Sequence, residues 1–349
     1  MSGAKLTPRE RFTRCAFGQD IDMLPIQCDF SGRGLKHFLA SKGISNVSDL
    51  ELLPFFENHV LYGYMNGATL RLKTKDMSQR IITDEWDVDW DTTQDLYYVR
   101  HPLEDWDNYE NYKFPDPWAP GYLDYLTDLV AKYSQTHIVT SYHFCTLFER
   151  AYMLRGFENL LTDFYLEEDL LCDLLDKITE FQVQFAKRCV SLGVNCGRTV
   201  DDYGTQTSMI MSPELWRKFI KPRLAKIIAV YRDAGLPMIH HSCGAIMPII
   251  GDLIEIGVNV LNPIQPKALD VKELSDKYGD KLTFFGGICN QSVLPFATPD
   301  EVEANVAEIT SILGRNGRYI IAPSNGVGND VPLENVEAYF RAAERCRHI

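Results

Sequence analysis

The chain has few of the features that mark exported, membrane-spanning or nucleic-acid-binding proteins. No run of 18 or more apolar residues occurs among its 349 residues, and residues 1–18 carry charge without an apolar stretch, so we expect no membrane span and no export signal. Lys and Arg number 35 against 48 Asp and Glu, which gives a formal net charge of -13. Because this charge repels phosphate backbones and anionic lipids, we expect neither nucleic acid nor membrane as a partner.

Regularly spaced cysteines are also absent. The nine cysteines are scattered along the chain and their number is odd, which is typical of free thiols in a reducing, cytoplasmic environment rather than of a disulfide framework. The glycine turns "GRNG" and "GVGND" lack the spacing of phosphate-binding loops. These absences predict an acidic, cytoplasmic, globular protein without a nucleotide-binding loop.

Helix signals recur along the chain. A threonine followed three residues later by a glutamate predicts capping boxes at two helix starts, Thr7–Glu10 and Thr298–Glu301. A further helix is expected over residues 212–235, with a kink at Pro222. Residues 157–192 repeat apolar side chains at i, i+3 and i+4, which is typical of one or two amphipathic helices.

Short apolar runs of the buried-strand type alternate with these helices. They cover residues 24–30, 137–144, 196–204, 237–243, 259–265, 282–290 and 319–325. Strands that alternate with helices are joined by crossovers into a parallel sheet, which is either doubly wound or closed into a barrel. Residues 60–120 interrupt the alternation with an antiparallel hairpin over residues 84–98 and a proline-rich loop. We therefore predict an α/β fold in which residues 1–349 form one domain.

Polar residues at the C-terminal ends of the expected strands favour the barrel. They are Asp29, His143, Asp201 and Asp202, His241 and Cys243, Asn262 and Gln265, Cys289 and Asn290, and Ser324 and Asn325. In a parallel α/β barrel these ends meet on one face, where catalytic groups come from several strands. We predict a single parallel (β/α)8 TIM-type barrel with an inserted N-terminal β-hairpin and one shared pocket.

His241 and Cys243 form the strongest candidate for a metal site. One residue separates them, so on an extended strand end their side chains point to the same side, while His240 points to the other side and is expected to be packed or hydrogen-bonded. Cys289 lies 46 residues beyond Cys243 and is the candidate third ligand, although its two preceding glycines offer a backbone reason for this sequence. Thiolate and imidazole ligands favour zinc, and three protein ligands leave a fourth position open for chemistry.

The remaining strand-end residues are candidates for contact with a substrate. Asp202 is the predicted catalytic group, because it is placed to orient a substrate, accept a proton or hydrogen-bond a zinc-bound histidine; capping the following loop is the alternative. The predicted substrate-binding residues are Asp29, His143, Tyr203, Asn262 and Gln265. For Glu149 and Arg150, a helix face or a salt bridge is the simpler explanation.

Four longer segments resemble one known family. They read "DDYGTQTSMIMSPELWRKFIKPRLAKI", "HHSCGAIMPIIGDLIEIGVNVLNPIQPKA", "FFGGICNQSVLPFATPDEV" and "IIAPSNGVGNDVPLENVEAYF". With "TPRERFTRCAFGQDIDMLPI" and "TDEWDVDW", they make the chain resemble the uroporphyrinogen decarboxylase superfamily, and within it the corrinoid-dependent zinc methyltransferases. The resemblance implies an α/β barrel with a deep pocket at the C-terminal ends of the strands.

The resemblance also implies zinc held by a His-x-Cys pair and a distant cysteine. His241 and Cys243 match the pair. The distant cysteine of methylcobamide:coenzyme M methyltransferases lies in an "APGC"-like strand end, where this sequence has Ser324 and Asn325. The expected third ligand is therefore Cys289, or otherwise a residue near Ser324.

The implied activity is the transfer of a methyl group between a small substrate and the cobalt of a corrinoid (cobalamin) carried by a partner protein. A methoxylated aromatic, which would undergo O-demethylation, is the preferred substrate, and a thiol acceptor is the alternative. True decarboxylases of the family carry an arginine-rich N-terminal segment, whereas "LPIQCDFSGRGLKHFL" has Arg33 alone. A metal-free decarboxylase that uses Asp29 or Asp202, and a non-catalytic tetrapyrrole binder, stay open, as does a homodimer.

Overall fold

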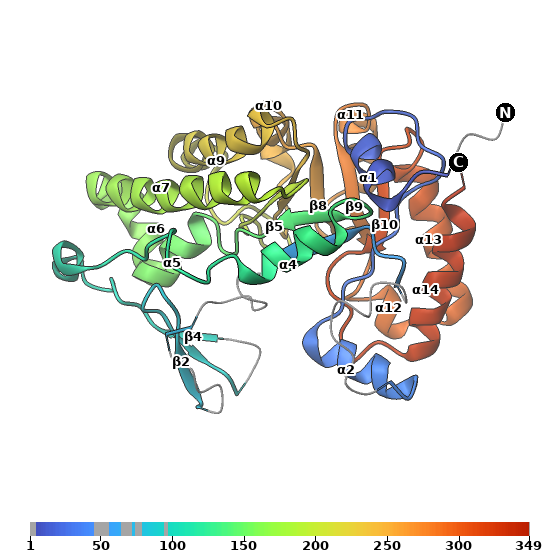
Figure 1. Cartoon of the computed structure of the whole chain (residues 1–349), viewed down its shortest axis with the longest axis horizontal. Coiled ribbons are helices and arrows are strands. Elements are labelled where there is room, and N and C mark those ends of the chain that lie inside the picture. Colours follow the sequence, from blue (N-terminus) through green and yellow to red (C-terminus); the bar gives the residue numbers. More distant parts are fainter. Residues whose placement is uncertain (1–4, 45–55, 64–71, 74–78, 94–96, 349) are drawn as a thin grey trace.

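Five parallel strands from the second half of the chain lie side by side in the order β10-β9-β8-β7-β6; three of them, β8, β9 and β10, are labelled in Figure 1. The structure is a computed structural model that describes residues 5–44, 56–63, 72–73, 79–93 and 97–348. The five strands are β6 (Gly197–Val200), β7 (Met238–His241), β8 (Val260–Ile264), β9 (Thr283–Ile288) and β10 (Tyr319–Pro323). Each falls inside a predicted apolar run, and nearly every residue in them is buried, which confirms these runs as buried strands.

A second parallel pair, β1 (Val60–Gly63) and β5 (Ile138–Ser141), continues the arrangement. Isolated parallel bridges join β5 to the β6 region at Thr140–Cys196 and His143–Thr199, and join the predicted strand 24–30 to β10 at Ile26–Ile321. β1 was not predicted, because it lies in the stretch where the strand–helix alternation is interrupted. The parallel α/β fold is confirmed, whereas closure of the two sheets into one barrel stays a prediction.

The side chain of Gln27 links residues 24–30 to β1. Its Oε1 accepts hydrogen bonds from the backbone N–H groups of His59 (3.1 Å) and Val60 (3.0 Å), and its Nε2 donates to Val60 O at 3.1 Å and to Asp29 Oδ1 at 2.8 Å. Gln27 is 1% exposed. One carboxamide therefore occupies the place where backbone groups of neighbouring strands would otherwise pair.

Helices cover the outside of the strands (Figure 1). In the first half of the chain they are α1 (Pro8–Ala16), α2 (Gly32–Ser41), the 3-10 helix η2 (Trp106–Asn111), α4 (Asp124–Tyr133), α5 (Phe148–Arg155), α6 (Phe157–Leu166) and α7 (Glu168–Leu192). In the second half they are α8 (Pro213–Leu215), η3 (Trp216–Ile220), α9 (Lys221–Asp233), the 3-10 helix η4 (Met247–Ile249), α10 (Ile250–Ile256), α11 (Val271–Tyr278), α12 (Val293–Phe296), α13 (Pro299–Leu313) and α14 (Leu333–Cys346). Both predicted capping boxes are present, at the start of α1 and at the start of α13.

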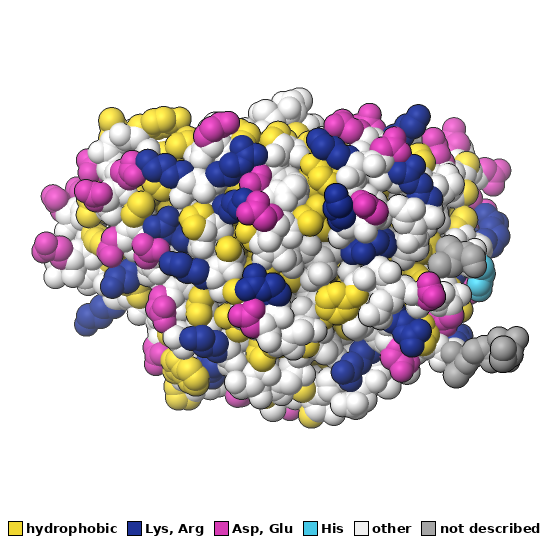
Figure 2. Space-filling model, turned by 90° about the horizontal axis from the view of Figure 1, so that it is seen from above, with side chains coloured by type: hydrophobic (Ala, Val, Ile, Leu, Met, Phe, Trp, Pro, Cys, Tyr) yellow, Lys and Arg dark blue, Asp and Glu magenta, His cyan; other side chains and the backbone are white. Residues whose placement is uncertain are grey.

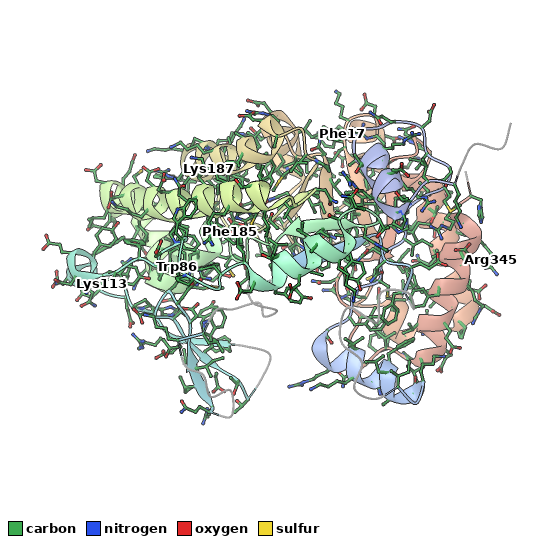
Figure 3. All side chains as sticks on the ribbon, viewed as in Figure 1. Phe17, Trp86, Lys113, Phe185, Lys187 and Arg345 are labelled. Atoms are coloured by element: carbon green, nitrogen blue, oxygen red, sulfur yellow. The ribbon has the colours of Figure 1, made fainter. Side chains whose placement is uncertain are left out.

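The predicted kink at Pro222 takes the form of a π-helical turn. The turn is η3, which leads directly into α9. Pro222 has no backbone N–H to donate to the preceding turn, so the helix widens before it. Residues 157–192 form α6 and α7 as predicted, and Figure 3 shows Lys187 on the outer side of α7, whereas Phe185 is fully buried.

An antiparallel sheet of three strands occupies the region of the predicted hairpin. Its strands are β2 (Ile81–Thr83), β3 (Asp89–Asp91) and β4 (Tyr97–Arg100), and it projects from the parallel strands in Figure 1. A buried salt bridge of 3.0 Å joins Arg150 of α5 to Asp84, and the Arg150 guanidinium lies 5.0 Å from the ring of Trp86. Of the two explanations offered for Arg150, a helix face or a salt bridge, the structure shows the salt bridge, which holds this sheet against α5.

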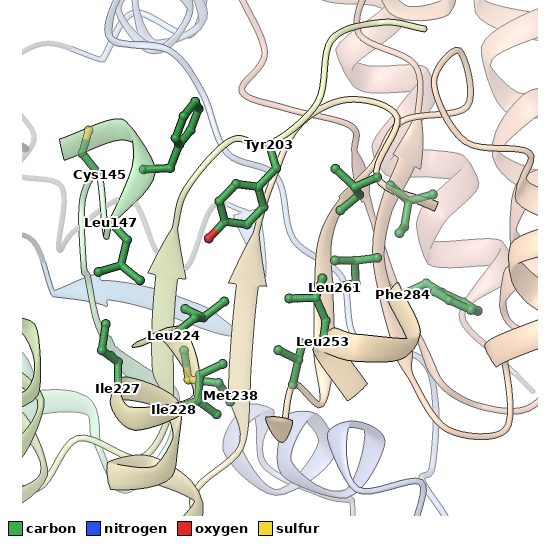
Figure 4. Packing of buried hydrophobic residues seen from close by; sticks show 14 of the residues in the cluster. Cys145, Leu147, Tyr203, Leu224, Ile227, Ile228, Met238, Leu253, Leu261 and Phe284 are labelled. Atoms are coloured by element: carbon green, nitrogen blue, oxygen red, sulfur yellow. The ribbon is translucent and has the colours of Figure 1, made fainter. Parts of the chain in front are cut away.

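The core lies between the strands and the helices. In Figure 4, Leu224, Ile227 and Ile228 of α9 lie beside Met238 of β7, and Tyr203 lies beyond the arrowheads of the strands. On the face seen in Figure 2, acidic and basic side chains are interspersed. Within the described residues, no helix combines the length and the apolar character needed to cross a membrane.

Candidate metal centre

Strand β7 turns His240 and His241 to opposite faces, as the two-residue period of a strand predicts. His240 is fully buried, its Nδ1 lies 2.9 Å from Thr199 Oγ1, and its ring stacks on Tyr203 with the centroids 5.6 Å apart. His241 instead lines a cavity at the C-terminal ends of the strands. The prediction that His240 is packed and hydrogen-bonded is confirmed.

Three side chains bring metal-ligating atoms together beside this cavity. Cys243 Sγ lies 3.6 Å from His241 Nε2, and Asp202 Oδ1 lies 3.8 Å from the same nitrogen. Asp202 Oδ1 also accepts the backbone N–H of Cys243 at 2.8 Å, which fixes the carboxylate against the loop that carries the thiol. One ligand atom from each of Asp202, His241 and Cys243 lies within 4.8 Å of the other two.

Burial sets the protonation of these groups. It lowers the pKa of His241, so the imidazole is neutral and keeps a lone pair for a metal. Burial and, next, the negative charge of Asp202 raise the pKa of the Cys243 thiol well above its usual range. A bound cation would reverse this effect, because coordination deprotonates a thiol.

The adjacent carboxylates Asp201 and Asp202 have different environments. Asp201 is fully buried and accepts the backbone N–H groups of Leu147 (3.2 Å), Phe148 (2.9 Å) and Glu149 (2.8 Å) at the start of α5. It also accepts the hydroxyl of Tyr203 at 2.8 Å. Asp201 therefore caps a helix, and of the two only Asp202 faces the cavity.

Cys289 lies outside the group formed by Asp202, His241 and Cys243 in the described structure. It is 6% exposed, and its Sγ accepts a hydrogen bond from Ser292 Oγ at 3.2 Å. Burial raises the pKa of the Cys289 thiol, but hydrogen bonds from Ser292 and from backbone N–H groups of residues 291–293 outweigh it, so the net shift is downward. Its role as the third ligand stays a prediction, whereas the structure brings Asp202 to the His-x-Cys pair.

Ser324 and Asn325 follow β10, at the position where the resemblance implies a cysteine. Ser324 Oγ donates to Asn290 Oδ1 at 2.9 Å and accepts its backbone N–H at 3.1 Å, so Ser324 organises the neighbouring loop. Asn325 lines the cavity, and its Nδ2 donates to Cys243 Sγ at 3.7 Å. An amide donor therefore lies beside the thiol at this position.

The cavity has a volume of about 420 Å³, and its wall combines aromatic rings with charged and polar side chains. It is lined by Asp29, Phe30, Ser31, Tyr62, Tyr142, Phe144, Glu149, Arg198, Val200, Asp202, His241, Asn262, Pro263, Phe285, Ala322, Pro323, Asn325 and Gly326. Of the predicted substrate-binding residues, Asp29 and Asn262 are in this lining. Asp29 accepts hydrogen bonds from Tyr62 (2.6 Å) and Gln27 (2.8 Å), which fix its carboxylate.

Three predicted substrate-binding residues are held elsewhere. His143 is buried between Gln182 and Tyr231, each 2.7 Å from one of its ring nitrogens. The Tyr203 hydroxyl is committed to Asp201, and Gln265 Oε1 accepts the backbone N–H of Gly244 at 2.7 Å, next to Cys243. Through these hydrogen bonds the three side chains stabilise the strand ends, and none of them lines the cavity.

Sequence reasoning missed Arg198, Tyr62, Tyr142 and Phe144 in the lining. Arg198 is 6% exposed and lies in the middle of β6, with its guanidinium 4.1 Å from the ring of Tyr62 and 5.1 Å from that of Tyr142. A signal for Arg198 was available, because arginine is rare inside a buried strand unless it is paired. The aromatic residues gave no such signal, since aromatic side chains also fill cores.

Comparison with known proteins shows that the chain is similar to methyltransferases of Methanosarcina. A methylcobamide:CoM methyltransferase of Methanosarcina barkeri is 26% identical over 50% of this chain and 49% of its own length, so the chain matches about half of that relative. Another methylcobamide:CoM methyltransferase, from Methanosarcina mazei, is 22% identical over 98% of this chain and 99% of its own length. A solved structure titled "methyltransferase from Methanosarcina mazei" has a TM-score of 0.71 at 18% identity and covers 98% of this chain and 99% of that chain, which indicates the same fold.

The family assignment rests on a longer match. Residues 86–346 match the family described as uroporphyrinogen decarboxylase (URO-D). This range contains every strand from β3 to β10 and all three residues of the candidate metal centre. The chain belongs to the uroporphyrinogen decarboxylase family.

Proposed function

We propose that this protein is a zinc-dependent methyltransferase that moves a methyl group from a methoxylated aromatic compound to the cobalt of a corrinoid carried by a partner protein. The observation that supports this proposal best is the convergence of Asp202, His241 and Cys243 beside a cavity whose wall includes several Phe and Tyr side chains. We further propose that the parallel strands close into one (β/α)8 barrel whose C-terminal face carries the site.

The donor set fits zinc in its chemistry, and its spacing is close to what zinc requires. Tetrahedral zinc with bonds of about 2.0–2.3 Å requires its nitrogen, oxygen and sulfur ligands to lie roughly 3.3–3.7 Å apart. The separation of Cys243 Sγ from His241 Nε2, 3.6 Å, lies within this range, whereas that of Asp202 Oδ1 from His241 Nε2, 3.8 Å, is slightly longer, so Asp202 would have to move toward a bound ion. Three protein ligands leave a fourth position that faces the cavity, as a catalytic metal requires.

The ligand set favours an oxygen substrate. When bound, zinc would act as a Lewis acid on the ether oxygen, which keeps the electron pair of the broken bond while the methyl group passes to the cobalt of the partner's corrinoid. A single thiolate with a carboxylate leaves more positive charge on the metal than two thiolates would, which favours stabilisation of a departing oxyanion.

The protein's own residues would hold the substrate and exclude water. Tyr62, Tyr142 and Phe285 supply ring faces for an aromatic substrate. Asp29 and Asn325 supply polar groups at the wall, and the hydrogen bonds of Tyr62 and Gln27 to Asp29 keep that carboxylate oriented without bound substrate. The methyl group must remain accessible from the open end of the cavity, because the partner approaches from there.

Transfer from methylcobamide to a thiol is the second candidate, and the names of the two Methanosarcina relatives favour it. In that reaction the same metal would lower the pKa of a bound thiol. The two candidates share the metal centre and differ in the atom that binds its open position. A screen of methoxylated aromatics with cob(I)alamin, run beside a screen of thiols with methylcobalamin, separates them.

Metal analysis of the purified protein tests the proposal. We expect about one zinc per chain in the wild type and in Cys289→Ser, and loss of zinc in Cys243→Ala with the fold retained by circular dichroism. Cys289→Ser is the matched control, since it removes a thiol at another strand end. A folded wild type without stoichiometric zinc, or Cys243→Ala that keeps its zinc, would overturn the proposed metal centre.

A further inference from the structure

We propose that Asn262, oriented by Arg198, fixes the tautomer of His241 so that its Nε2 presents a lone pair to the metal. Arg198 lies on β6, Asn262 on β8 and His241 on β7 between them. The inference concerns positioning residues and rests on the proposed function only for the identity of the metal. The arrangement of the three side chains is a property of the metal-free protein.

Of the three contacts of the Asn262 amide, those with Arg198 and with the Phe285 carbonyl determine its orientation independently of His241. Its Oδ1 lies 3.3 Å from Arg198 Nη2 and 2.7 Å from His241 Nδ1, and its Nδ2 donates to Phe285 O at 3.4 Å. A guanidinium has only donors, so the Asn262 atom that faces it must be the oxygen. The flipped amide would place a donor against Arg198 and would lose the bond to the Phe285 carbonyl.

The orientation of Asn262 in turn determines where His241 carries its proton. An amide oxygen only accepts, so its 2.7 Å contact with His241 Nδ1 requires a hydrogen on that nitrogen. Arg198 Nη2 also lies 3.4 Å from Nδ1, but Asn262 Oδ1, at 2.7 Å, is the nearer partner of that nitrogen. A neutral imidazole with Nδ1 protonated has its lone pair on Nε2, the nitrogen next to Cys243 Sγ and Asp202 Oδ1.

Arg198 is itself held in place by aromatic rings. Its guanidinium lies over Tyr62 of β1 and near Tyr142, at the end of β5, with distances to the ring centroids of 4.1 and 5.1 Å. β5 and β7 flank β6 on different sides, so Tyr142 holds the guanidinium from one side of β6 while Nη2 reaches Asn262 beyond β7 on the other. The three strands β6, β7 and β8 therefore support one another through side chains as well as backbone.

The tautomer is measured directly by nitrogen NMR on the metal-free protein labelled with 15N-histidine. The His241 signals are assigned by their loss in His241→Gln, which is needed because the chain has 8 histidines. We expect Nδ1 protonated and Nε2 unprotonated in the wild type. Asn262→Leu removes the acceptor in a side chain of similar shape and should let the tautomers mix.

Zinc affinity, measured by competition with a chromophoric chelator, is the second readout. Loss of a group that orients a metal-binding histidine weakens affinity by roughly 10–100-fold. We expect this loss in Asn262→Leu and recovery of most of it in Asn262→Asp, which keeps an acceptor. Asn325→Leu is the matched control: it removes a cavity amide that contacts Cys243 Sγ rather than His241, and the His241 tautomer should not change.

The outcomes distinguish this inference from the proposed function. A metal-free wild type with the proton on Nε2, or an Asn262→Leu protein with unchanged tautomer and unchanged zinc affinity, would overturn the inference. If Asn262→Leu does not fold, Arg198→Met takes its place, and mixed tautomers are again the expected result. A wild type that binds no zinc but shows the Nδ1-protonated form, lost in Asn262→Leu, would overturn the proposed function and support the positioning role.

Discussion

The cavity side of strands β6, β7 and β8 differs from the side that faces the helices, although the same short segments supply both. On the cavity side, Asp202, His241 and Cys243 bring an oxygen, a nitrogen and a sulfur together. On the helix side, Asp201 and His240 are fully buried and hydrogen-bonded to α5 and to Thr199, respectively. A polar residue at a strand end is therefore not in itself evidence of chemistry, because a shift of one residue exchanges a ligand for a structural group.

The largest difference between the two sides should appear in a pair of histidine variants. We expect His241→Ala to lose zinc and to lower methyl transfer by more than about 100-fold, since it removes a ligand rather than a group that orients one. His240→Asn should keep its zinc and lose only stability, because His240 is packed on Tyr203. Metal content and the rate of methyl transfer to cob(I)alamin check both. Equal zinc loss in the two variants would contradict the claim that only the cavity side of the strands holds metal ligands.

A smaller effect is expected when the cavity carboxylate is neutralised. Asp202→Asn keeps the side-chain shape and the acceptor for the backbone N–H of Cys243 but removes the charge. We expect zinc affinity to fall by about 10–100-fold, measured by chelator competition, with the fold unchanged. If affinity is unchanged in Asp202→Asn and falls in Cys289→Ser instead, the third ligand is Cys289.

Asp201→Asn is the matching change on the helix side, and it should act on stability. The buried carboxylate accepts the Glu149 N–H at Oδ1 and two N–H groups and the Tyr203 hydroxyl at Oδ2, and an amide would place its NH2 group against the donors of one of these two oxygens. We expect the free energy of unfolding to fall by about 2 kcal/mol, with zinc content retained. Chemical denaturation measures the change; an unaltered midpoint would show that the Asp201 cap contributes little.

The smallest expected effect is the contribution of the buried His143 to the pH dependence of the free energy of unfolding. Burial lowers the pKa of His143 to about 4 in the folded protein, whereas the pKa in the unfolded chain is near 6.5. At a pH between these two pKa values, the unfolded chain binds a proton that the folded chain does not. Stability should therefore fall as pH drops from about 6 to 4, with His143 contributing about 1.4 kcal/mol per pH unit. In His143→Gln the slope should be shallower by that amount. Identical slopes would mean that His143 is protonated in the fold.

Much of the architecture was readable from the sequence, because strand–helix alternation and capping boxes are local signals. The five strands from β6 to β10 fall inside predicted runs, and the opposite directions of His240 and His241 follow from the period of a strand. β1 was missed, because it has only four residues and lies where the alternation of strands and helices is interrupted, so its sequence shows little periodicity. The three-stranded antiparallel sheet also extends beyond the expected span of 84–98.

The site was less readable, because it depends on which side chains meet across strands. The sequence marks Asp201 and Asp202 as a pair but does not say which faces the cavity, since the start of α5 is far away along the chain. For the same reason it placed His143 with a substrate rather than between Gln182 and Tyr231. It offered Cys289 as the partner of the His-x-Cys pair, whereas contacts across β6 and β7 bring Asp202 there.

The side-chain conformation of Gln27 determines both the junction of residues 24–30 with β1 and the orientation of the Asp29 carboxylate. The same Nε2 that donates to Val60 O also donates to Asp29 Oδ1, so the spacing of the first two parallel segments and the aim of a cavity carboxylate are set together. Neither is adjustable alone. A substrate that required Asp29 to move would therefore also require new hydrogen bonds between residues 24–30 and β1.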